Sequence, residues 1–273
     1  LTHLTREGAV YGTDKPIWFA GRGTWLFAEL YRVYGESSFR ELALHGARFL
    51  DAHGFDTDGR MYFLVDRTGR PLRQRRYHYS DVFAVLAYAA LASIGISQYR
   101  ERATARFDRL VHDLNTPDPH PKVNPAVRPT RSLSPVMCLL AVADAVQPIV
   151  GARAEALIDT AVTEVFEHFV RTKDATVRET VSADGSLLDT PEGRVMNPGH
   201  AIETAWFMLE IARRRDDRVL LGKALKVLDG SLARGWDAEY GGLFYFIDVA
   251  GLPSPYLEHD MKLWWPHCEA LYA

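Results

Sequence analysis

The chain has 273 residues, of which 47% are hydrophobic, so it is long enough to bury a substantial core. Its net charge of −3 gives no electrostatic reason to expect a nucleic acid or a membrane surface as partner, and no apolar run reaches the ~18 residues of a membrane span. Its 2 cysteines lie in helix-like segments, which argues against a disulfide framework and leads us to expect a cytoplasmic protein.

Paired helical patterns follow one another along the chain. Their apolar residues recur with a period of about 3.6 residues, which is typical of α-helices. The first helix of each pair is apolar on nearly every side and is expected to be buried, whereas the second is amphipathic and faces solvent. The predicted helices cover residues 17–34, 37–53, 78–94, 97–113, 131–147, 151–171, 198–214, 217–234 and 257–273.

Short polar turns that close on glycine lie between the helix pairs. They end at Gly8, Gly69, Gly185 and Gly251, and most are flanked by apolar or β-branched residues, which predicts β-hairpins. The turns recur about every 60 residues, with one interval twice as long. Because repeated helix pairs stack into a solenoid or close into a ring, we predict one all-α domain over 1–273, an α/α toroid with short hairpins. An open α-solenoid is the alternative.

Polar residues cluster at the starts of the buried helices. If alternate helices run parallel, these starts gather at one end of the ring, where unpaired backbone N–H groups create a mildly positive field. Aromatic rings beside forked donors and carboxylates suit a sugar, because the rings stack on its C–H face and the charged groups bind its hydroxyls. The candidate catalytic residues are Arg22, His200, Glu203 and Glu269, and the candidate substrate-binding residues are Trp18, Tyr79, Asp81, Asn197, Trp265 and His267.

His200 is the most informative of these residues. It stands just after Pro198, where a helix is expected to begin, and Glu203 follows on the same helical face. A carboxylate beside an imidazole fixes its tautomer and raises its basicity, which is typical of an acid or base catalyst. The alternative is that His200 caps the helix and Glu203 completes a capping box, and on this segment alone capping is the more common arrangement.

Two further groups admit both a functional and a structural interpretation. A buried guanidinium at Arg22 needs either a polyhydroxyl ligand or a structural carboxylate. Glu258, Lys262, Trp265 and Glu269 form one stripe on the predicted last helix, which is either part of the site or a solvated face with an ordinary ion pair. The adjacent "LWWP" favours the site. No glycine-rich phosphate loop and no Cys/His zinc spacing is present, so no metal site is predicted.

Five stretches of the chain resemble one known family. They read "KPIWFAGRGTWLFAELYR", "MYFLVDRTGRPLRQRR", "NPGHAIETAWF", "YGGLFYFIDVAG" and "MKLWWPHCEALYA". Together they are similar, in the same order and over nearly the whole chain, to the N-acylglucosamine 2-epimerase family. The combination of NPGH, a glutamate on the next helical turn and a later KLWWPH-x-E is specific to that resemblance.

The resemblance implies an (α/α)6 barrel and inversion at C2 of an N-acylated aminosugar, of the N-acetylglucosamine/N-acetylmannosamine type. It implies that His200 is an acid/base catalyst, that Arg22 contacts the substrate and that Glu269 lies in the site. It also implies a helix before the first one here and a second acid/base histidine on a later helix. Neither His259 nor His267 stands at that place, so we expect the barrel to be incomplete in this chain.

Three functions remain open at this point. The first is the sugar 2-epimerase, the second an aldose–ketose isomerase acting on a related sugar, and the third a non-catalytic member that binds a sugar or a protein. The epimerase chemistry needs no metal and no redox cofactor, and the resemblance allows a nucleotide effector. The expected partner is a small-molecule sugar, with a homodimer left open.

Overall fold

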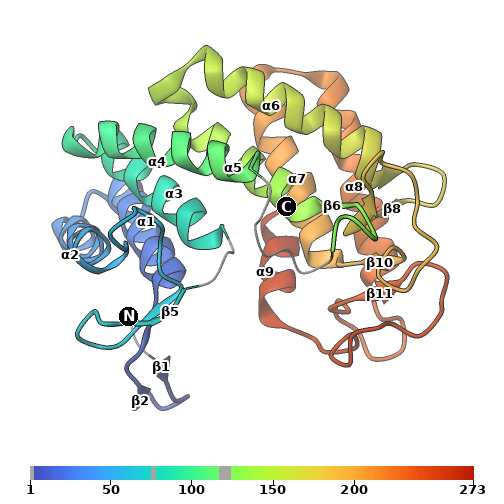
Figure 1. Cartoon of the computed structure of the whole chain (residues 1–273), viewed down its shortest axis with the longest axis horizontal. Helices are drawn as coiled ribbons and strands as arrows, with labels where there is room; N and C mark the ends of the chain where they lie inside the picture. The colour runs from blue at the N-terminus through green and yellow to red at the C-terminus, as the bar shows by residue number, and fades with distance from the viewer. Residues whose placement is uncertain (1–2, 75–77, 117–123) are drawn as a thin grey trace. The chain divides into compact units, whose positions relative to one another are not determined.

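The computed structural model describes residues 3–74, 78–116 and 124–273 (Figure 1). The chain forms two compact units, the first made of residues 1–119 with 145–154 and the second of residues 120–144 with 155–273. Each unit is built from helix pairs with short antiparallel strands between them. The hairpins predicted at Gly8 and Gly69 are confirmed, whereas those predicted at Gly185 and Gly251 are wrong, because the strands that precede these two glycines, 180–182 and 247–248, pair with the distant segments 130–132 and 195–196.

The helices of the first unit form two pairs. The inner helix of the first pair packs against its own partner and against the inner helix of the second pair, which in turn packs against its partner. The second inner helix is buried along most of its length, including Ala84. In chain order these helices are α1 (Ile17–Tyr34), α2 (Ser37–His53), α3 (Tyr79–Ser93) and α4 (Gln98–Leu114).

Glycines allow these helices to approach closely. A Cβ on Gly21 of α1 would lie 2.9 Å from the backbone carbonyl carbon of Phe83 on α3. A Cβ on Gly46 of α2 would lie 2.2 Å from the hydroxyl oxygen of Thr24 on α1. A larger side chain at Gly21 therefore pushes α1 and α3 apart, whereas one at Gly46 requires the Thr24 hydroxyl to turn away.

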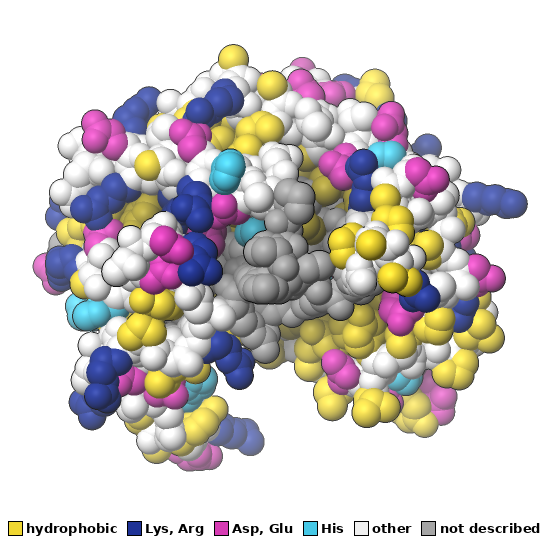
Figure 2. Space-filling model, viewed as in Figure 1, with side chains coloured by type: hydrophobic (Ala, Val, Ile, Leu, Met, Phe, Trp, Pro, Cys, Tyr) yellow, Lys and Arg dark blue, Asp and Glu magenta, His cyan; other side chains and the backbone are white. Residues whose placement is uncertain are grey.

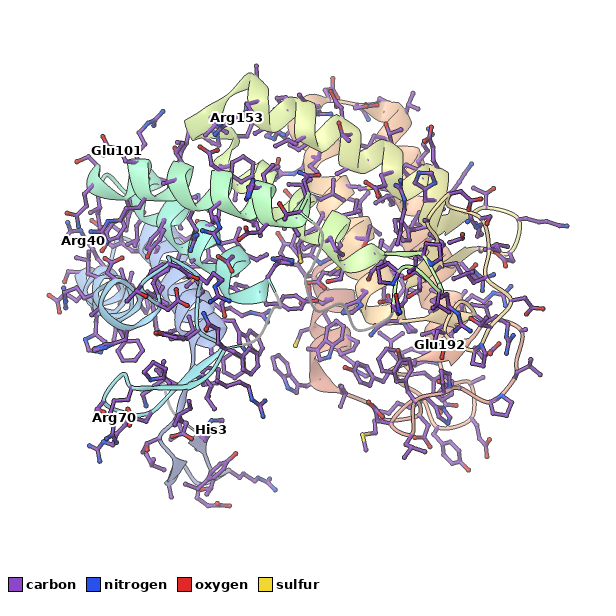
Figure 3. All side chains as sticks on the ribbon, in the orientation of Figure 1. His3, Arg40, Arg70, Glu101, Arg153 and Glu192 are labelled. Atoms are coloured by element: carbon purple, nitrogen blue, oxygen red, sulfur yellow. The ribbon has the colours of Figure 1, made fainter. Side chains whose placement is uncertain are left out.

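A polar cluster ties three helices of the first unit together. Asp51 of α2 accepts hydrogen bonds from the hydroxyls of Tyr88 on α3, at 2.8 Å, and Tyr99 on α4, at 3.2 Å. Arg102 of α4 forms an ion pair with the same carboxylate. The two tyrosine rings stack at 5.4 Å, so the cluster is both packed and hydrogen-bonded. At the edge of this unit Arg153, labelled in Figure 3, pairs with Asp108 at 2.7 Å.

The strands of the first unit are short and antiparallel. One hairpin turns at Gly8 and the other at Gly69, both with positive φ, as the sequence predicts for turn-closing glycines. The strands are β1 (His3–Leu4), which pairs with β2 (Val10–Gly12), and β3 (Lys15–Pro16), which pairs with β4 (Leu64–Val65), itself paired with β5 (Pro71–Arg73).

The second unit carries the remaining helices. Its central helix packs against the helix that follows it and against the last helix of the chain. In chain order the helices are α5 (Leu133–Val150) and α6 (Ala152–Glu164), which carry the chain between the units, a π-helical turn η1 (Val165–Phe169), α7 (Pro198–Arg215), α8 (Arg218–Gly235) and α9 (Trp264–Tyr272).

The described residues of the second unit form three antiparallel strand pairs. The pair that matters most for the site leads directly into α7, so it fixes where that helix begins. The pairs are β6 (Thr130–Ser132) with β9 (Thr180–Ser182), β7 (Val170–Arg171) with β8 (Thr176–Val177), and β10 (Val195–Met196) with β11 (Ile247–Asp248).

Two predicted helices are wrong at one end. The helix expected to begin at 257 begins at Trp264, because Pro266 has no backbone N–H and fits only in the first turn of a helix. The helix expected over 151–171 ends at Glu164 and continues as η1 and β7. The other predicted helices agree with the structure to within three residues at each end.

The helix α5 corrects the expectation that no segment reaches the length of a membrane span. Over Leu133–Val150 its mean hydropathy is 1.8, so by length and composition it meets that criterion, with 44% of the window buried. Leu133, Leu140 and Val146 are fully buried in the structure. Apolar core helices satisfy the same criterion.

Candidate active site

The start of α7 is capped by Asn197. Its side-chain oxygen accepts a hydrogen bond from the backbone N–H of His200 at 3.0 Å, and Pro198 occupies the first helical position. The interpretation of His200 as the cap is therefore wrong. Asn197 is only 1% exposed, which argues against the substrate-binding role that we predicted for it.

The ring of His200 faces a carboxylate from another element. Its Nδ1 lies 3.0 Å from Oε2 and 3.2 Å from Oε1 of Glu179. The side chains are 22% and 17% exposed, so the pair is largely shielded from water. Glu179 is held by its backbone, because its N–H donates to Val195 O at 3.2 Å and its C=O accepts from Leu133 N at 3.0 Å.

The environment of His200 favours the protonated ring. Burial alone lowers the pKa of His200, but the charge of Glu179, its hydrogen bond and the charge of Glu203 outweigh burial and raise the pKa to about 9. At neutral pH the ring is therefore an imidazolium. Its Nε2 has no hydrogen-bond partner within residues 3–74, 78–116 and 124–273.

Glu203, the carboxylate that we expected beside His200, acts on the ring through its charge, and Glu179 supplies a hydrogen bond as well as charge. The charge of Glu203 is also felt on α5. Burial raises the pKa of the Cys138 thiol to about 12, and Glu203 contributes to the rise. Glu203 thus lies close enough to act on both α7 and α5.

Aromatic rings line one side of His200. The ring of Trp265, at the start of α9, lies with its centroid 5.4 Å from that of His200. Gly199 makes this approach possible, because a Cβ there would lie 2.5 Å from the Trp265 ring. Tyr245 meets Trp265 edge to face at 6.2 Å. This surface suits the C–H face of a sugar ring.

Glu269 also lies at this end of the second unit. It is 9% exposed and accepts a hydrogen bond from the indole N–H of Trp206 at 2.9 Å. The bond joins α9 to α7 and fixes the orientation of the carboxylate. The catalytic role that we predicted for Glu269 stays a prediction.

His267 has a structural role that leaves no ring nitrogen for a ligand. Its Nδ1 lies 2.6 Å from Leu263 O, and its Nε2 accepts the backbone N–H of Leu243 at 2.9 Å. Both contacts are satisfied by a neutral ring that carries its proton on Nδ1. The structure therefore argues against the substrate-binding role that we predicted for His267.

Glu258, Lys262, Trp265 and Glu269 do not form one helical stripe, because the first two precede the helix. Residues 257–263 are not helical, and Lys262 turns toward Asp237, with Nζ 2.8 Å from its Oδ2. The same ammonium lies 3.5 Å from the centre of the Phe244 ring. Lys262 and His267 therefore anchor the loop after α8 to the start of α9, and Trp265 is the residue of this motif that faces His200.

The remaining predicted site residues belong to the first unit. Trp18 and Arg22 gather around Phe83, with Trp18 at 5.9 Å between ring centroids and the Arg22 guanidinium carbon 5.4 Å from the ring centre. Tyr79 is half-buried at the first position of α3. That these residues share a ligand with His200 stays a prediction.

Asp81 is paired within the first unit. Its carboxylate lies 3.3 Å from Nη1 of Arg106, and both side chains are nearly buried. Burial raises the pKa of Asp81, and the charge of Arg106 opposes that rise. This ion pair gives Asp81 a structural role, and the predicted contact with substrate stays a prediction.

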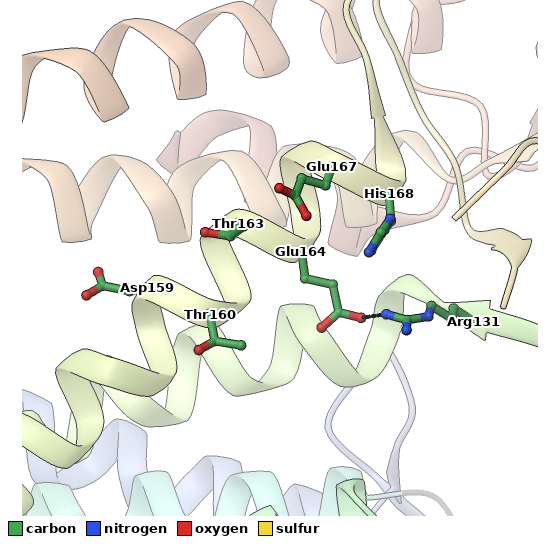
Figure 4. Close-up of a pocket in the computed structure, with 7 residues that line it drawn as sticks. All are labelled: Arg131, Asp159, Thr160, Thr163, Glu164, Glu167 and His168. Atoms are coloured by element: carbon green, nitrogen blue, oxygen red, sulfur yellow. Dashed lines mark hydrogen bonds and ion pairs between the residues drawn. The ribbon is translucent and has the colours of Figure 1, made fainter. Parts of the chain in front are cut away.

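A surface groove of about 460 Å³ lies elsewhere on the second unit (Figure 4). Two of its lining residues, Arg131 and Glu164, form an ion pair at 3.2 Å. None of the predicted site residues lines it. The lining residues are Arg131, Asp159, Thr160, Thr163, Glu164, Glu167 and His168. On the face seen in Figure 2, acidic and basic side chains are intermixed rather than gathered by sign.

Sequence reasoning missed Glu179. It stands in "TVRETVS", a largely buried segment rich in β-branched residues that runs from β8 to β9, where a carboxylate is out of place unless it has a partner. The sequence shows this carboxylate, but it does not show the partner, which depends on how the segment packs against α7. In the part of the chain that the structure describes, no cluster of three His, Cys, Asp or Glu residues could hold a metal ion.

A family model and a related protein both match the chain over its whole length. The sequence model of a family described as N-acylglucosamine 2-epimerase (GlcNAc 2-epimerase) matches residues 1–273. The bovine (Bos taurus) N-acylglucosamine 2-epimerase is 36% identical over 288 residues, which cover 100% of this chain and 67% of that protein. The chain thus spans about two thirds of the length of this relative.

Solved structures with the same fold come from sugar-converting enzymes. A D-mannose isomerase has a TM-score of 0.78 at 21% identity, covering 98% of this chain and 70% of its own. The cellobiose 2-epimerase of Bacillus thermoamylovorans has a TM-score of 0.80 at 16% identity, covering 97% of this chain and 71% of its own. Cellobiose 2-epimerases have an (α/α)6 toroid fold, so the predicted fold class is confirmed.

Proposed function

Because the chain belongs to the N-acylglucosamine 2-epimerase family, we propose that it inverts C2 of an N-acylated aminosugar, interconverting sugars of the N-acetylglucosamine and N-acetylmannosamine type. The observation that carries the proposal is the His200–Glu179 pair beside Trp265. It offers a proton-transferring nitrogen next to an aromatic surface, at the start of a helix. The family's enzymes and this chain's relatives are carbohydrate epimerases and isomerases, the enzyme class that we expected.

The chemistry is a proton exchange at one carbon. When the sugar ring opens, the aldehyde at C1 acidifies the hydrogen on C2. A base removes that proton, the C–H electron pair becomes the C1–C2 double bond of an enediolate-like intermediate, and an acid returns a proton to the opposite face of C2. Arg22 is our candidate for the donor that stabilises the negative charge on O1.

His200 enters this scheme as the acid. With a pKa of about 9 it carries a proton on Nε2 at neutral pH, and donation to C2 leaves a neutral ring still bonded to Glu179 through Nδ1. In the reverse reaction the same nitrogen takes the proton back. The resemblance leads us to expect the second acid/base group on a later helix than α9.

The direct test follows the hydrogen on C2. The protein is incubated with N-acetylglucosamine or N-acetylmannosamine in deuterated water, and both sugars are followed by proton NMR. We expect each sugar to yield the other and to gain deuterium at C2. Absence of exchange with both sugars, from a protein shown to be folded, contradicts the proposal.

A second candidate rests on the similarity to D-mannose isomerase, whose structure superposes with a TM-score of 0.78. An aldose–ketose isomerase moves the proton from C2 to C1 on one face, so one acid/base group is enough. Incubation with mannose distinguishes the two reactions, because fructose forms only if the proton is delivered to C1. A non-catalytic member binds sugar, seen by ligand-detected NMR, without deuterium exchange.

Neither reaction needs a redox cofactor, because no electrons leave the sugar, and a reaction without a metal stays a prediction. A nucleotide effector, a homodimer and a cytoplasmic location stay predictions. The partner that we propose is a small-molecule sugar with a free C1 carbonyl. Addition of ATP to the exchange assay, with and without a chelator, tests the effector and the metal together.

A further inference from the structure

We propose that Glu179 is a positioning residue of the site, which holds the His200 ring through Nδ1 and so makes Nε2 the one ring nitrogen that a sugar can reach. Its part in turnover rests on the proposed function. Its effect on the orientation and proton of His200 does not, and can be measured without any sugar.

The geometry of the contact carries this inference. Both carboxylate oxygens of Glu179 lie within hydrogen-bond distance of Nδ1, at 3.0 Å and 3.2 Å, so the ring nitrogen points at the centre of the carboxylate. Trp265 packs against the ring with a centroid distance of 5.4 Å. One hydrogen-bonded nitrogen and one packed face leave the ring a single orientation.

The position of Glu179 is itself fixed by the fold. It lies between β8 and β9, and its two backbone hydrogen bonds reach Val195, just before α7, and Leu133, the first residue of α5. The link between β8 and β9, two strands that pair with different partners, therefore places the carboxylate beside His200 from outside the helix that carries the histidine. A helix alone does not do this, because Glu203 on the next turn of α7 influences His200 only through its charge.

The other groups around the pair do not compete for the proton. Burial raises the pKa of Tyr245, and the charges of Glu258 and Glu179 raise it further. Burial likewise raises the pKa of Tyr256, followed by the charges of Glu179, Glu192 and Glu258. Both phenols therefore stay neutral over the range in which His200 titrates, and the remaining charges near the ring are those of Glu179 and Glu203.

The experiment is a histidine titration by NMR. The protein is labelled with 15N-histidine, His200 is assigned from the signal that disappears in His200→Asn, and its ring nitrogens are followed from pH 5 to pH 10. In the parent we expect titration near pH 9. In Glu179→Gln, which keeps the shape and removes the charge, we expect the pKa of His200 to fall below its ordinary value of 6.5, because burial, which lowers the pKa, is then opposed by the charge of Glu203 alone.

Matched variants separate this effect from general loss of charge. Glu210→Gln removes a carboxylate from the same helix, one that pairs with Arg213 at 2.5 Å, and should leave the titration of His200 unchanged. Glu203→Gln should lower the pKa of His200 by less than Glu179→Gln does. Glu179→Asp keeps the charge and should restore part of the shift.

If His200 titrates in Glu179→Gln as it does in the parent, Glu179 does not hold the ring and the inference is overturned. Where the parent exchanges the C2 hydrogen, Glu179→Gln should lower kcat by up to about 10²–10⁴-fold, the contribution of general acid–base catalysis, with little change in KM. A parent that titrates as expected but exchanges no sugar contradicts the proposed function and leaves the role of Glu179 confirmed.

Discussion

Asn197 and His200 divide two tasks at the start of α7. Asn197 satisfies a backbone N–H of the first turn, and His200 is thereby released to face Glu179. From the sequence the two roles could not be assigned, because either residue can cap a helix. The structure separates them by burial, with Asn197 1% exposed and the His200 side chain 22% exposed.

Replacement of His200 by asparagine tests this division. We expect His200→Asn to lower C2 exchange by about 10²–10⁴-fold, because the group that transfers the proton is lost, while sugar binding changes little. The cap at Asn197 is untouched, so far-UV circular dichroism should show an unchanged helix content. A variant that exchanges the C2 hydrogen at the parent's rate rules out His200 as the acid.

The pH dependence of stability follows from the same pair. The pKa of His200 is raised from 6.5 to about 9 on folding, so the folded state holds its proton more tightly than the unfolded state does. The resulting stabilisation is fully present below pH 6.5 and is lost as the pH rises through 9. Urea unfolding of the parent and of His200→Asn should give free energies that differ most near pH 6 and converge near pH 10.

At the scale of elements, glycine decides how closely two inner helices pack. Gly21→Ala places a methyl 2.9 Å from the backbone of Phe83, and α1 and α3 must separate to accept it. We expect a loss of about 1–3 kcal/mol in the free energy of unfolding, measured by urea titration.

The matched control is Gly222→Ala in α8. A Cβ at Gly222 meets nothing within 4 Å, so the substitution only removes backbone freedom from the unfolded chain. It should raise the free energy of unfolding by about 0.4–1 kcal/mol. Equal effects of the two alanines would mean that α1 and α3 are not in close contact at Gly21.

Helix positions were predictable because the apolar period is a local property. The bounds of α1 and α2 agree with the prediction at both ends. The predicted start of α9 was wrong because the prediction did not take account of Pro266, which fits only in the first turn of a helix. This preference of proline is also a local property of the sequence. Glu179 could not be paired with His200 from the sequence, since the two residues are 21 positions apart and their contact depends on how the link between β8 and β9 packs against α7.

On the scale of the whole molecule, the two units share a contact between a glycine turn and a histidine side chain. In the first unit a Cβ on Gly69 would lie 2.1 Å from Nδ1 of His53, at the end of α2. In the second unit a Cβ on Gly185 would lie 2.1 Å from Nδ1 of His168, in the turn after α6. Both glycines have positive φ, and each of the two turns lies against a histidine at the end of the preceding outer helix or just beyond it.

The two cysteines differ in exposure, so a thiol reagent can label one of them selectively in the folded protein. Cys138 is buried and its thiol has a pKa of about 12, so it is not a nucleophile at neutral pH, whereas Cys268 is exposed on α9, three residues beyond Trp265. We expect a maleimide dye to couple to one thiol per folded chain, counted by mass spectrometry, and to two after denaturation. A fluorophore can therefore be attached beside the aromatic surface without any mutation, as a reporter of sugar arrival.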